Sequence, residues 1–567
     1  MFYCPYWSIN LRFKYILRFK YIIPICILIF VITCVNVYAV SDAEIEMLIG
    51  SMSVEEKVGQ LLMYGIGGRE VGPIPKGHIT KRFVGGIILY GRNIQTPQQV
   101  AALTTELQQL AQETPNGIPL FISIDQEGGI VNRMNKGATV LPGNLALGAT
   151  RSITLAEKAG EITAIELATV GVNLNFAPVL DVNTNPLNPV IGVRAYGESP
   201  QLVSQLGTAY IRGLQKNGVL ATAKHFPGHG DTHVDSHKKL PIVTHDIKRV
   251  NSVELVPFRA AIEADVAAIM PAHILYPSLD TEYPATLSYK ILTTILRRQL
   301  GYDGLIITDD LEMQAIDAKY DTGDAAVMSI QAGADIVIVS WTLKKQQRVY
   351  NSLRQAVKTR KITETRLNES VRRILKNKGA CGAFEKPYVQ IENPNAINSP
   401  LAKIGSAKHR DVAQTIATRA VTLVKNTPGT LPLKSEPQKP VLLISPSREF
   451  SNTFLKAHTD ISNITPVLIP LQVNQKLLLP QILLSKPSLI VAGIVNAQQA
   501  DLVHQISQKT DVPIIVISLR SPYLLGKCPD VACSVAAYDD NYYSVLAAVE
   551  VLLGKRAAVG KLPVTIP

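Results

Sequence analysis

The chain has 567 residues, of which 47% are hydrophobic and 18% are charged, and its formal net charge is +12. This length predicts two domains, and the hydrophobic content excludes an intrinsically disordered protein. The basic residues are scattered, without an arginine-rich stripe or interleaved aromatic residues, which argues against nucleic-acid binding.

The first 39 residues differ in character from the rest. Four basic residues precede an apolar run over residues 22–32, and small residues follow near Ala39. This order predicts a secretory signal peptide over residues 1–39, and hence an exported bacterial protein, periplasmic or extracellular. A retained membrane anchor is the alternative, although the run is short and contains Pro24. Cys34 weakly resembles a lipoprotein cleavage site, but Thr33 fits such a site poorly.

Three of the six cysteines lie beyond this leader. They are too few for a disulfide framework, although Cys528 and Cys533 could pair in an oxidising compartment.

Eight short apolar runs alternate with helical segments from residue 41 to residue 386. Runs that are apolar throughout are typical of parallel strands buried on both faces. Eight of them, each followed by a helix, predict a (β/α)₈ TIM-type barrel whose last helix is Glu364–Lys378. The runs are Gln60–Ile66, Val84–Tyr90, Leu120–Asp125, Asn173–Leu180, Val219–His225, Ala267–His273, Gly304–Asp309 and Asp335–Ser340.

A second, smaller domain is expected after a linker over residues 387–407 that is rich in Asn and Pro. Residues 408–567 again alternate apolar runs with helical segments, which predicts a small doubly wound α/β sandwich. The domain opens with a run over residues 412–424 that begins as a helix and ends as the first expected strand. The other expected strands are Val441–Ser445, Leu489–Val495, Pro513–Ser518 and Ser534–Ala537. No glycine-rich phosphate loop follows these strands, so no nucleotide is expected.

Polar side chains stand where the barrel strands end. They are Asp125, Asp181, Lys224 with His225, His273 and Asp309. Barrel enzymes assemble their active sites from the carboxyl ends of several strands. One buried polar residue has structural explanations, but a ring of them indicates an enzyme.

The stretch 224–237 holds four of the ten histidines and two aspartates. Its histidines, His225, His229, His233 and His237, are spaced by four, which on a helix would present metal ligands on one face. Pro227 and the neighbouring glycines break such a helix, which weakens the metal interpretation. The other interpretation is a dyad in which Asp235 orients His237 for proton transfer.

Lys224–Gly230, with the sequence KHFPGHG, followed by Asp235–His237, resembles family 3 glycoside hydrolases of the β-N-acetylglucosaminidase branch. Further matching motifs are Phe121–Gly129 and Gly304–Met313, with weaker ones at Ala420–Asn426 and Gly560–Val564. The resemblance implies a retaining exo-glycosidase that releases terminal N-acetyl-β-D-glucosamine from glycosides such as peptidoglycan fragments, without a metal or cofactor.

The resemblance also implies roles for individual residues. Asp309, with Asp310 beside it, would be the nucleophile that forms a covalent glycosyl intermediate. His237 would be the acid/base, oriented by Asp235; Asp231 and Asp310 are the next candidates. Sugar contacts would come from Asp125, Arg133, Arg194, Lys224 and His225. Ile130 stands where relatives usually carry arginine, so this loop departs from the pattern of the family.

Three other functions stay open at this point. A metal-dependent barrel hydrolase would use the histidine stretch, and a degenerate barrel would bind sugars without cleaving them. A histidine acid/base does not repel phosphate as a carboxylate would, so phosphorolysis of the intermediate is the third. The expected partners are N-acetylglucosamine-containing glycosides or muropeptides, with membrane contact only through an uncleaved leader.

Overall fold

The computed structural model describes residues 40–386, 399–433, 439–457, 463–472 and 475–567. The predicted signal peptide and most of the predicted linker lie outside these ranges. Residues from Ala39 to Pro567 form one compact unit by their contacts. The predicted boundary between the barrel domain and the C-terminal domain therefore stays a prediction. Within the described ranges, no helix combines the length and apolarity needed to cross a bilayer.

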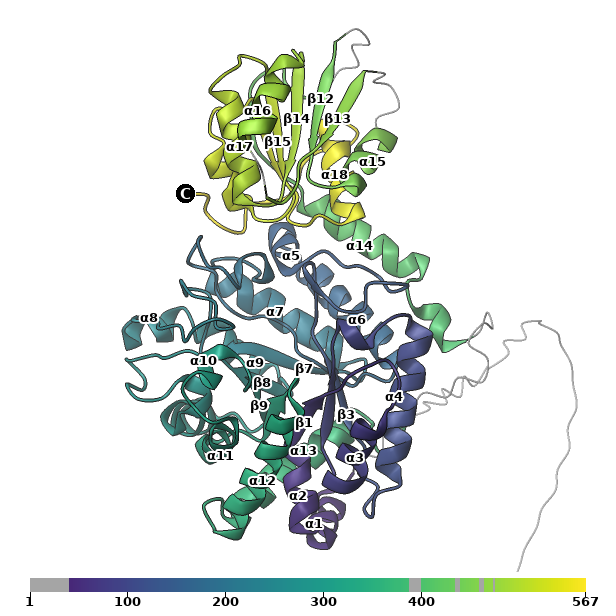
Figure 1. Cartoon of the computed structure of the whole chain (residues 1–567), viewed down its shortest axis with the longest axis vertical. Coiled ribbons are helices and arrows are strands. Elements are labelled where there is room, and N and C mark those ends of the chain that lie inside the picture. The colour runs from purple at the N-terminus through teal and green to yellow at the C-terminus, as the bar shows by residue number, and fades with distance from the viewer. Residues whose placement is uncertain (1–39, 387–398, 434–438, 458–462, 473–474) are drawn as a thin grey trace, which may run out of the picture. The chain divides into compact units, whose positions relative to one another are not determined.

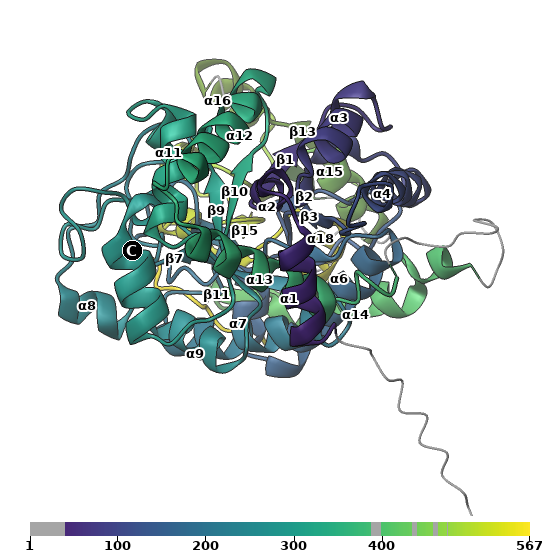
Figure 2. The same cartoon turned by 90° about the horizontal axis from the view of Figure 1, so that it is seen from below.

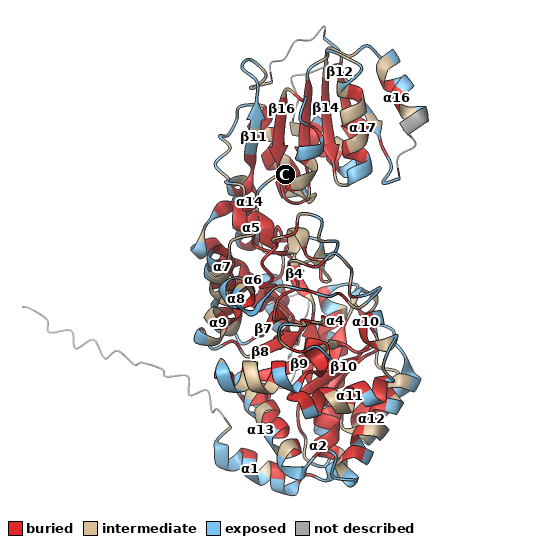
Figure 3. Ribbon diagram, turned by 90° about the vertical axis from the view of Figure 1, so that its left-hand side faces the viewer, coloured by how far each residue is buried: buried red, intermediate tan, exposed pale blue. Residues whose placement is uncertain are grey.

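Eight parallel strands form a closed barrel in the order β1-β10-β9-β8-β7-β6-β3-β2 (Figures 1 and 2). This confirms the predicted barrel. The strands are β1 (Leu62–Gly65), β2 (Gly86–Leu89), β3 (Phe121–Ile124), β6 (Leu174–Asn175), β7 (Leu220–Phe226), β8 (Ala268–Pro271), β9 (Leu305–Asp310) and β10 (Ile336–Val339). They are buried almost throughout, because helices cover their outer side and side chains fill the interior (Figure 3).

Helices surround this barrel in chain order. They are α1 (Asp42–Ser51), α2 (Val54–Gln60), α3 (Pro73–Arg82), α4 (Pro97–Gln112), α5 (Asn144–Thr150), α6 (Ile153–Thr169), α7 (Pro200–Gln215), α8 (Ile247–Ser252), α9 (Val256–Glu263), the π-helix η4 (Lys290–Gln299), α10 (Gln314–Asp317), α11 (Thr322–Ala332), α12 (Leu343–Lys358) and α13 (Glu364–Ala380). Most begin at a residue whose side chain accepts an amide hydrogen bond; Ser53, for example, caps α2 in a capping box.

The fourth barrel strand is shorter than the predicted run over residues 173–180. Strand β6 covers only Leu174–Asn175, and pairing with β7 resumes in a single bridge between Val179 and Lys224. Pro178 lies between them and has no amide hydrogen to donate to a ladder, which accounts for the interruption. The hairpin formed by β4 (Gln126–Gly128) and β5 (Val131–Asn132) was not predicted from the sequence.

The C-terminal sheet has the order β11-β16-β15-β14-β12-β13, parallel except for β11. Its strands are β11 (Thr422–Asn426), β12 (Val441–Ser445), β13 (Ile464–Leu468), β14 (Leu489–Ile494), β15 (Ile514–Ser518) and β16 (Cys533–Ala536). Apolar cores on its two faces involve α16 (Gln475–Leu484) and α17 (Ala497–Ser507) on one side, and α14 (Ala407–Ala420), α15 (Arg448–Ala457) and α18 (Tyr542–Leu552) on the other (Figure 1). This confirms the predicted α/β sandwich.

Cys528 and Cys533 are buried free thiols in the structure, so the disulfide that their spacing allowed is not formed. Cys533 lies in β16, while Cys528 ends the turn η6 (Pro522–Lys527) and points its sulfur at the carbonyl of Ala500. The two thiols are therefore held by different elements.

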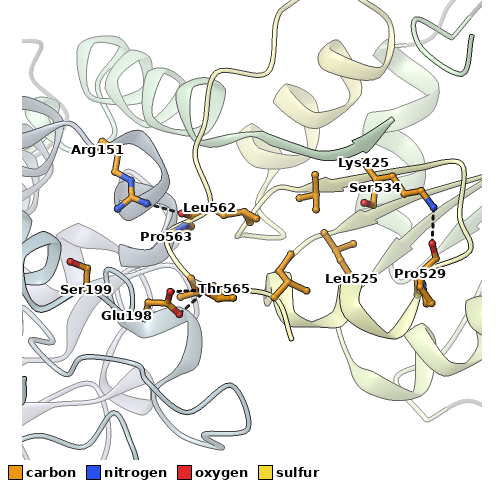
Figure 4. Close-up of a pocket in the computed structure, with 14 residues that line it drawn as sticks. Arg151, Glu198, Ser199, Lys425, Leu525, Pro529, Ser534, Leu562, Pro563 and Thr565 are labelled. Atoms are coloured by element: carbon orange, nitrogen blue, oxygen red, sulfur yellow. Dashed lines mark hydrogen bonds between the residues drawn. The ribbon is translucent and has the colours of Figure 1, made fainter. Parts of the chain in front are cut away.

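The C-terminal tail links the sheet to the barrel. Leu145 and Ala149 of α5 share one apolar core with Val564. Arg151 donates a hydrogen bond to the carbonyl of Leu562 at 2.7 Å, and Thr565 donates two to the Glu198 carboxylate at 2.9 and 2.6 Å (Figure 4). A pocket of about 570 Å³ opens beside these contacts.

Candidate active site

The structure brings most of the predicted site residues to the carboxyl end of the barrel. Asp125 directly follows β3, Lys224 and His225 are among the last residues of β7, and Asp309 lies near the end of β9. Arg194 comes from the short helix η2 (Gly192–Arg194) in the long connection after β6. Four strands of the barrel, β3, β6, β7 and β9, and the segments that follow them thus contribute to one mouth, because the carboxyl ends of the strands of a parallel barrel lie on one face.

A buried ion-pair network forms the floor of this site. The Lys224 ammonium lies 2.7 Å from the Asp125 carboxylate and 2.8 Å from that of Glu127. Arg194 in turn donates two hydrogen bonds to Glu127, from Nε at 2.9 Å and from Nη2 at 2.8 Å. This two-pronged pair holds the guanidinium plane in one orientation.

Mutual charge keeps these groups ionised although they are buried. Burial alone would raise the pKa of Glu127, but Arg194 and Lys224 lower it below its usual range. Burial likewise opposes the charge of Lys224, yet Asp125 and Glu127 raise its pKa. The site therefore presents fixed cations and anions that suit the hydroxyl groups of a sugar.

Arg133 lies apart from this network. Its backbone amide donates to the side-chain oxygen of Gln126 at 2.9 Å, which ties the β4–β5 hairpin together. Its side-chain Nε is buried and has no hydrogen-bond partner among the described residues. A buried donor without a partner is costly, so this group is suited to an acceptor that the structure does not hold.

A second polar cluster fixes the start of the histidine stretch. Asp181 accepts hydrogen bonds from the imidazole Nδ1 of His225 at 2.7 Å and from the backbone amide of His229 at 2.7 Å. His229 also contacts the hydroxyls of Thr232 and Ser236 at 2.8 and 3.1 Å. Asp181 thereby shapes the loop between Lys224 and the dyad.

Asp309 lies among cationic and imidazole side chains. Burial alone would raise its pKa, but His273, His225 and Lys224 lower it, so the carboxylate is held ionised. His273 is itself fixed, with Nε2 donating to the carbonyl of Asp310 at 3.0 Å. Asp310 is different, because burial raises the pKa of its carboxyl to about 7.

Asp235 and His237 form the predicted pair. The Asp235 carboxylate accepts from the backbone amide of His237 at 2.9 Å and from its imidazole Nδ1 at 2.8 Å. Since Nδ1 donates to the carboxylate, Nε2 is the nitrogen that can exchange a proton with a ligand. The His237 side chain is 63% exposed, so its imidazole is accessible to a ligand.

The four histidines do not converge on one point. His225 binds Asp181, His229 binds Thr232 and Ser236, His233 contacts Asn185, and His237 binds Asp235. Across the described ranges, no group of three His, Cys, Asp or Glu side chains is arranged to hold a metal ion. The four histidines thus take part in separate hydrogen bonds of one loop.

Three residues of the candidate site were not assigned a role from the sequence. Glu127 links Lys224 to Arg194, Asp181 orients His225, and Tyr90 donates or accepts a hydrogen bond with Ser340 at 2.7 Å. Asp181 was visible as a polar residue at a strand end. Glu127 had only one signal, its position two residues beyond Asp125, because its partners are distant in the chain.

The C-terminal domain reaches this site through two hydrogen bonds, from Tyr523 in η6 and from Asp539 after β16. Asn183 donates from Nδ2 to the Tyr523 hydroxyl at 3.0 Å, and it also accepts at Oδ1 from the amide of Gly192 at 3.0 Å. Gly192 begins the helix that carries Arg194. Asp539 accepts from the amide of Gly143 at 3.2 Å. The second domain thus supports the segments around Arg194 and the hairpin.

Comparison with known proteins agrees with this geometry. The family model of the glycosyl hydrolase family 3 N-terminal domain matches residues 53–377. Beta-hexosaminidase A of Pseudoalteromonas piscicida is 35% identical over 551 residues, which cover 86% of this chain and 90% of that protein.

Two solved structures resemble nearly the whole chain. A family 3 β-N-acetylglucosaminidase from Paenibacillus sp. strain FPU-7 superposes with a TM-score of 0.84 at 38% identity, covering 91% of this chain and 99% of that one. A β-glucoside phosphorylase superposes with a TM-score of 0.80 at 26% identity, covering 92% of this chain and 95% of that one. The protein is therefore a glycoside hydrolase, and it belongs to family 3.

Proposed function

We propose that this glycoside hydrolase is a retaining, exo-acting β-N-acetylglucosaminidase that works through a covalent intermediate on Asp309. The observation that carries the proposal is the environment of Asp309, a half-buried carboxylate near the end of β9 whose pKa His273, His225 and Lys224 lower. An ionised, oriented carboxylate is what a retaining glycosidase needs as its nucleophile.

In the first step, the Asp309 carboxylate attacks the anomeric carbon while the bond from that carbon to the leaving oxygen breaks. His237 donates the proton on Nε2 to the leaving oxygen, so the aglycone departs as an alcohol. Asp235 stabilises the imidazolium form before this transfer through its hydrogen bond at 2.8 Å. Asp125, Arg133, Arg194, Lys224 and His225 would hold the sugar hydroxyls and the acetamido group.

In the second step, a water molecule attacks the anomeric carbon of the glycosyl ester. His237 accepts a proton from this water at Nε2, and the bond between sugar and Asp309 breaks, which regenerates both groups. Net retention follows from two inversions. The similarity to proteins named β-hexosaminidase and β-N-acetylglucosaminidase supports a terminal N-acetylhexosamine as the sugar released.

We further propose peptidoglycan fragments as the natural substrates and an exported location. The support is the basic and apolar composition of residues 1–39, which resembles a signal peptide. Amino-terminal sequencing of the protein recovered from culture fractions tests it: a chain beginning near Val40 outside the cytoplasm supports export. A chain beginning at Met1 in the membrane fraction would contradict cleavage.

The activity is tested by hydrolysis of a chromogenic N-acetyl-β-glucosaminide by the wild type, Asp309→Ala and His237→Ala, with and without a chelator. We expect activity that resists the chelator, is abolished by the first substitution and falls strongly with the second. A 5-fluoro sugar that labels Asp309 in the wild type establishes the covalent step. Activity that disappears with the chelator would restore the metal-dependent alternative.

Phosphorolysis is the second candidate, because one solved relative is a β-glucoside phosphorylase. Products formed with and without inorganic phosphate separate the two reactions. Free N-acetylglucosamine in both conditions means hydrolysis. A sugar 1-phosphate as the main product would show that phosphate, and not water, attacks the glycosyl ester.

A further inference from the structure

Trp341 is an exposed aromatic residue at the mouth of the barrel. It follows Ser340 directly after β10, and 61% of its surface is exposed. The chain has two tryptophans, of which the other is Trp7. A large apolar ring that stays exposed beside an active site indicates a contact for a ligand.

The ring is held firmly in spite of its exposure. The guanidinium of Arg92 lies over the indole at 3.9 Å from the ring centre, and it is itself fixed by hydrogen bonds to the carbonyls of Ile66 at 2.9 Å and Ser340 at 3.0 Å. The Trp341 amide donates to the Glu312 carboxylate at 2.6 Å. A ring fixed in advance binds with little loss of conformational entropy.

Two contacts place Trp341 beside the reacting groups. Its ring packs against that of Tyr90 at 5.2 Å between centres. Tyr90 directly follows β2, and its hydroxyl lies 2.7 Å from that of Ser340, which directly follows β10, so both residues lie at the carboxyl end of the barrel where Asp125 and Asp309 lie. Burial, followed by the charges of Asp310, Asp125 and Asp309, raises the pKa of Tyr90, which agrees with this position. Trp341 therefore stands outside Tyr90, on the rim above the position of the reacting sugar.

The same rim approaches the acid/base. Glu312, which anchors Trp341, lies in the turn between β9 and α10. Three residues further on, the amide of Ala315 donates to the carbonyl of Ser236 at 3.2 Å, and Ser236 lies between Asp235 and His237. The proton donor and the exposed indole thus flank one turn, so a leaving group protonated by His237 would depart along this side.

From these contacts we propose that the indole of Trp341 is the platform for the aglycone, and that the preferred aglycone is a pyranose ring. This rests on the proposed glycosidase function and extends it to the leaving-group subsite. The apolar C–H face of a pyranose packs on an aromatic ring, while its hydroxyls stay in solvent. A small aglycone such as a methyl group does not reach the rim, so it gains nothing from the platform.

Kinetics with two substrates tests the subsite. We compare the wild type, Trp341→Ala and Trp341→Phe on N,N′-diacetylchitobiose and on methyl N-acetyl-β-glucosaminide. For Trp341→Ala, kcat/KM on the disaccharide should fall about three- to tenfold, as expected for loss of one aromatic contact, with less than about a twofold change on the methyl glycoside. Trp341→Phe should retain part of the difference.

The control is Leu343→Ala, which removes a neighbouring exposed apolar side chain and should leave both substrates unaffected. An equal loss on the two substrates, or no loss on either, would overturn the subsite while leaving the glycosidase function intact. A wild-type protein that cleaves neither substrate would instead refute the proposed function, and the subsite with it.

Fluorescence gives a readout that does not depend on turnover. In a Trp7→Phe, Asp309→Asn protein, Trp341 is the single tryptophan, and the disaccharide is not consumed. We expect N,N′-diacetylchitobiose to change the emission of Trp341, and N-acetylglucosamine, which fills only the inner position, to leave it nearly unchanged. Competitive binding of the disaccharide without any change in emission would contradict stacking on this ring.

Discussion

Replacement of Glu127 by glutamine tests whether the buried network holds the binding site together. The carboxylate accepts three hydrogen bonds at 2.8–2.9 Å, two from Arg194 and one from Lys224. Glutamine keeps the shape of the side chain but removes the negative charge. It also turns an amide N–H₂ group toward one of the two cations, so a donor then faces a donor.

The expected loss is large because both cations stay buried. Removing one partner of a buried ion pair costs about 3–5 kcal/mol in the free energy of unfolding. Lys224 retains Asp125 at 2.7 Å, whereas the one other acceptor that Arg194 has among the described residues is the carbonyl of Val190 at 3.2 Å. The guanidinium should therefore move more than the ammonium. A shift of a binding group by about 1 Å lowers kcat/KM by up to about 100-fold.

Two measurements check this prediction: urea unfolding followed by circular dichroism, and kcat/KM on the chromogenic substrate. Glu161→Gln is the matched control, because it makes the same chemical change at an exposed glutamate on α6 and should alter neither quantity. If Glu127→Gln unfolds within about 0.5 kcal/mol of the wild type and keeps its KM, the ion pairs do not organise the site and the reasoning is refuted.

Three further changes probe the dyad, the second domain and a buried acid. Asp235→Asn should lower kcat about 100-fold, because it removes the carboxylate that orients His237 and leaves the imidazole in place. The free energy of unfolding should not change, and a loss in kcat below about threefold would contradict the dyad. Tyr523→Phe should raise KM about two- to fivefold with little change in kcat, whereas Tyr542→Phe, an exposed control, should have no effect. Burial raises the pKa of Asp539 from 3.8 to about 7, so its stabilising, protonated form is lost as the pH rises toward 7. Stability measured from pH 4 to 7 should therefore fall less steeply in Asp539→Asn, by up to about 1.4 kcal/mol per pH unit. Identical slopes would show that folding does not raise the pKa of Asp539.

The barrel could be predicted because its strands are buried on both faces. Such strands are apolar without interruption, so Ile336–Val339 or Leu62–Gly65 are visible in the sequence alone. The edge strand β13 (Ile464–Leu468) was missed because it is half exposed and includes Pro466, which an edge position tolerates. Pairing at an edge depends on neighbours that lie elsewhere in the chain, and no local pattern carries that information.

For the candidate site, the sequence predicted which residues lie at strand ends but not which residues they bind. Residues at strand ends converge by topology, which is why Asp125, Lys224 and Asp309 could be expected together. The partners of these residues could not be predicted, because Glu127 binds Arg194, which lies 67 residues further along the chain. The reach of Tyr523 to the segment of Arg194 was also invisible, since it depends on how the C-terminal sheet contacts the barrel.

The choice of nucleophile between Asp309 and Asp310 illustrates what the structure adds. The two carboxyls are neighbours in the chain, and local sequence favours neither on chemical grounds. In the structure, His273, His225 and Lys224 lower the pKa of Asp309, while burial raises that of Asp310 to about 7. At neutral pH the first is an anion, and the second is protonated in a large share of the molecules. Since only the ionised form attacks an anomeric carbon, this environment supports the proposal of Asp309 rather than Asp310 as the nucleophile, without recourse to a family motif.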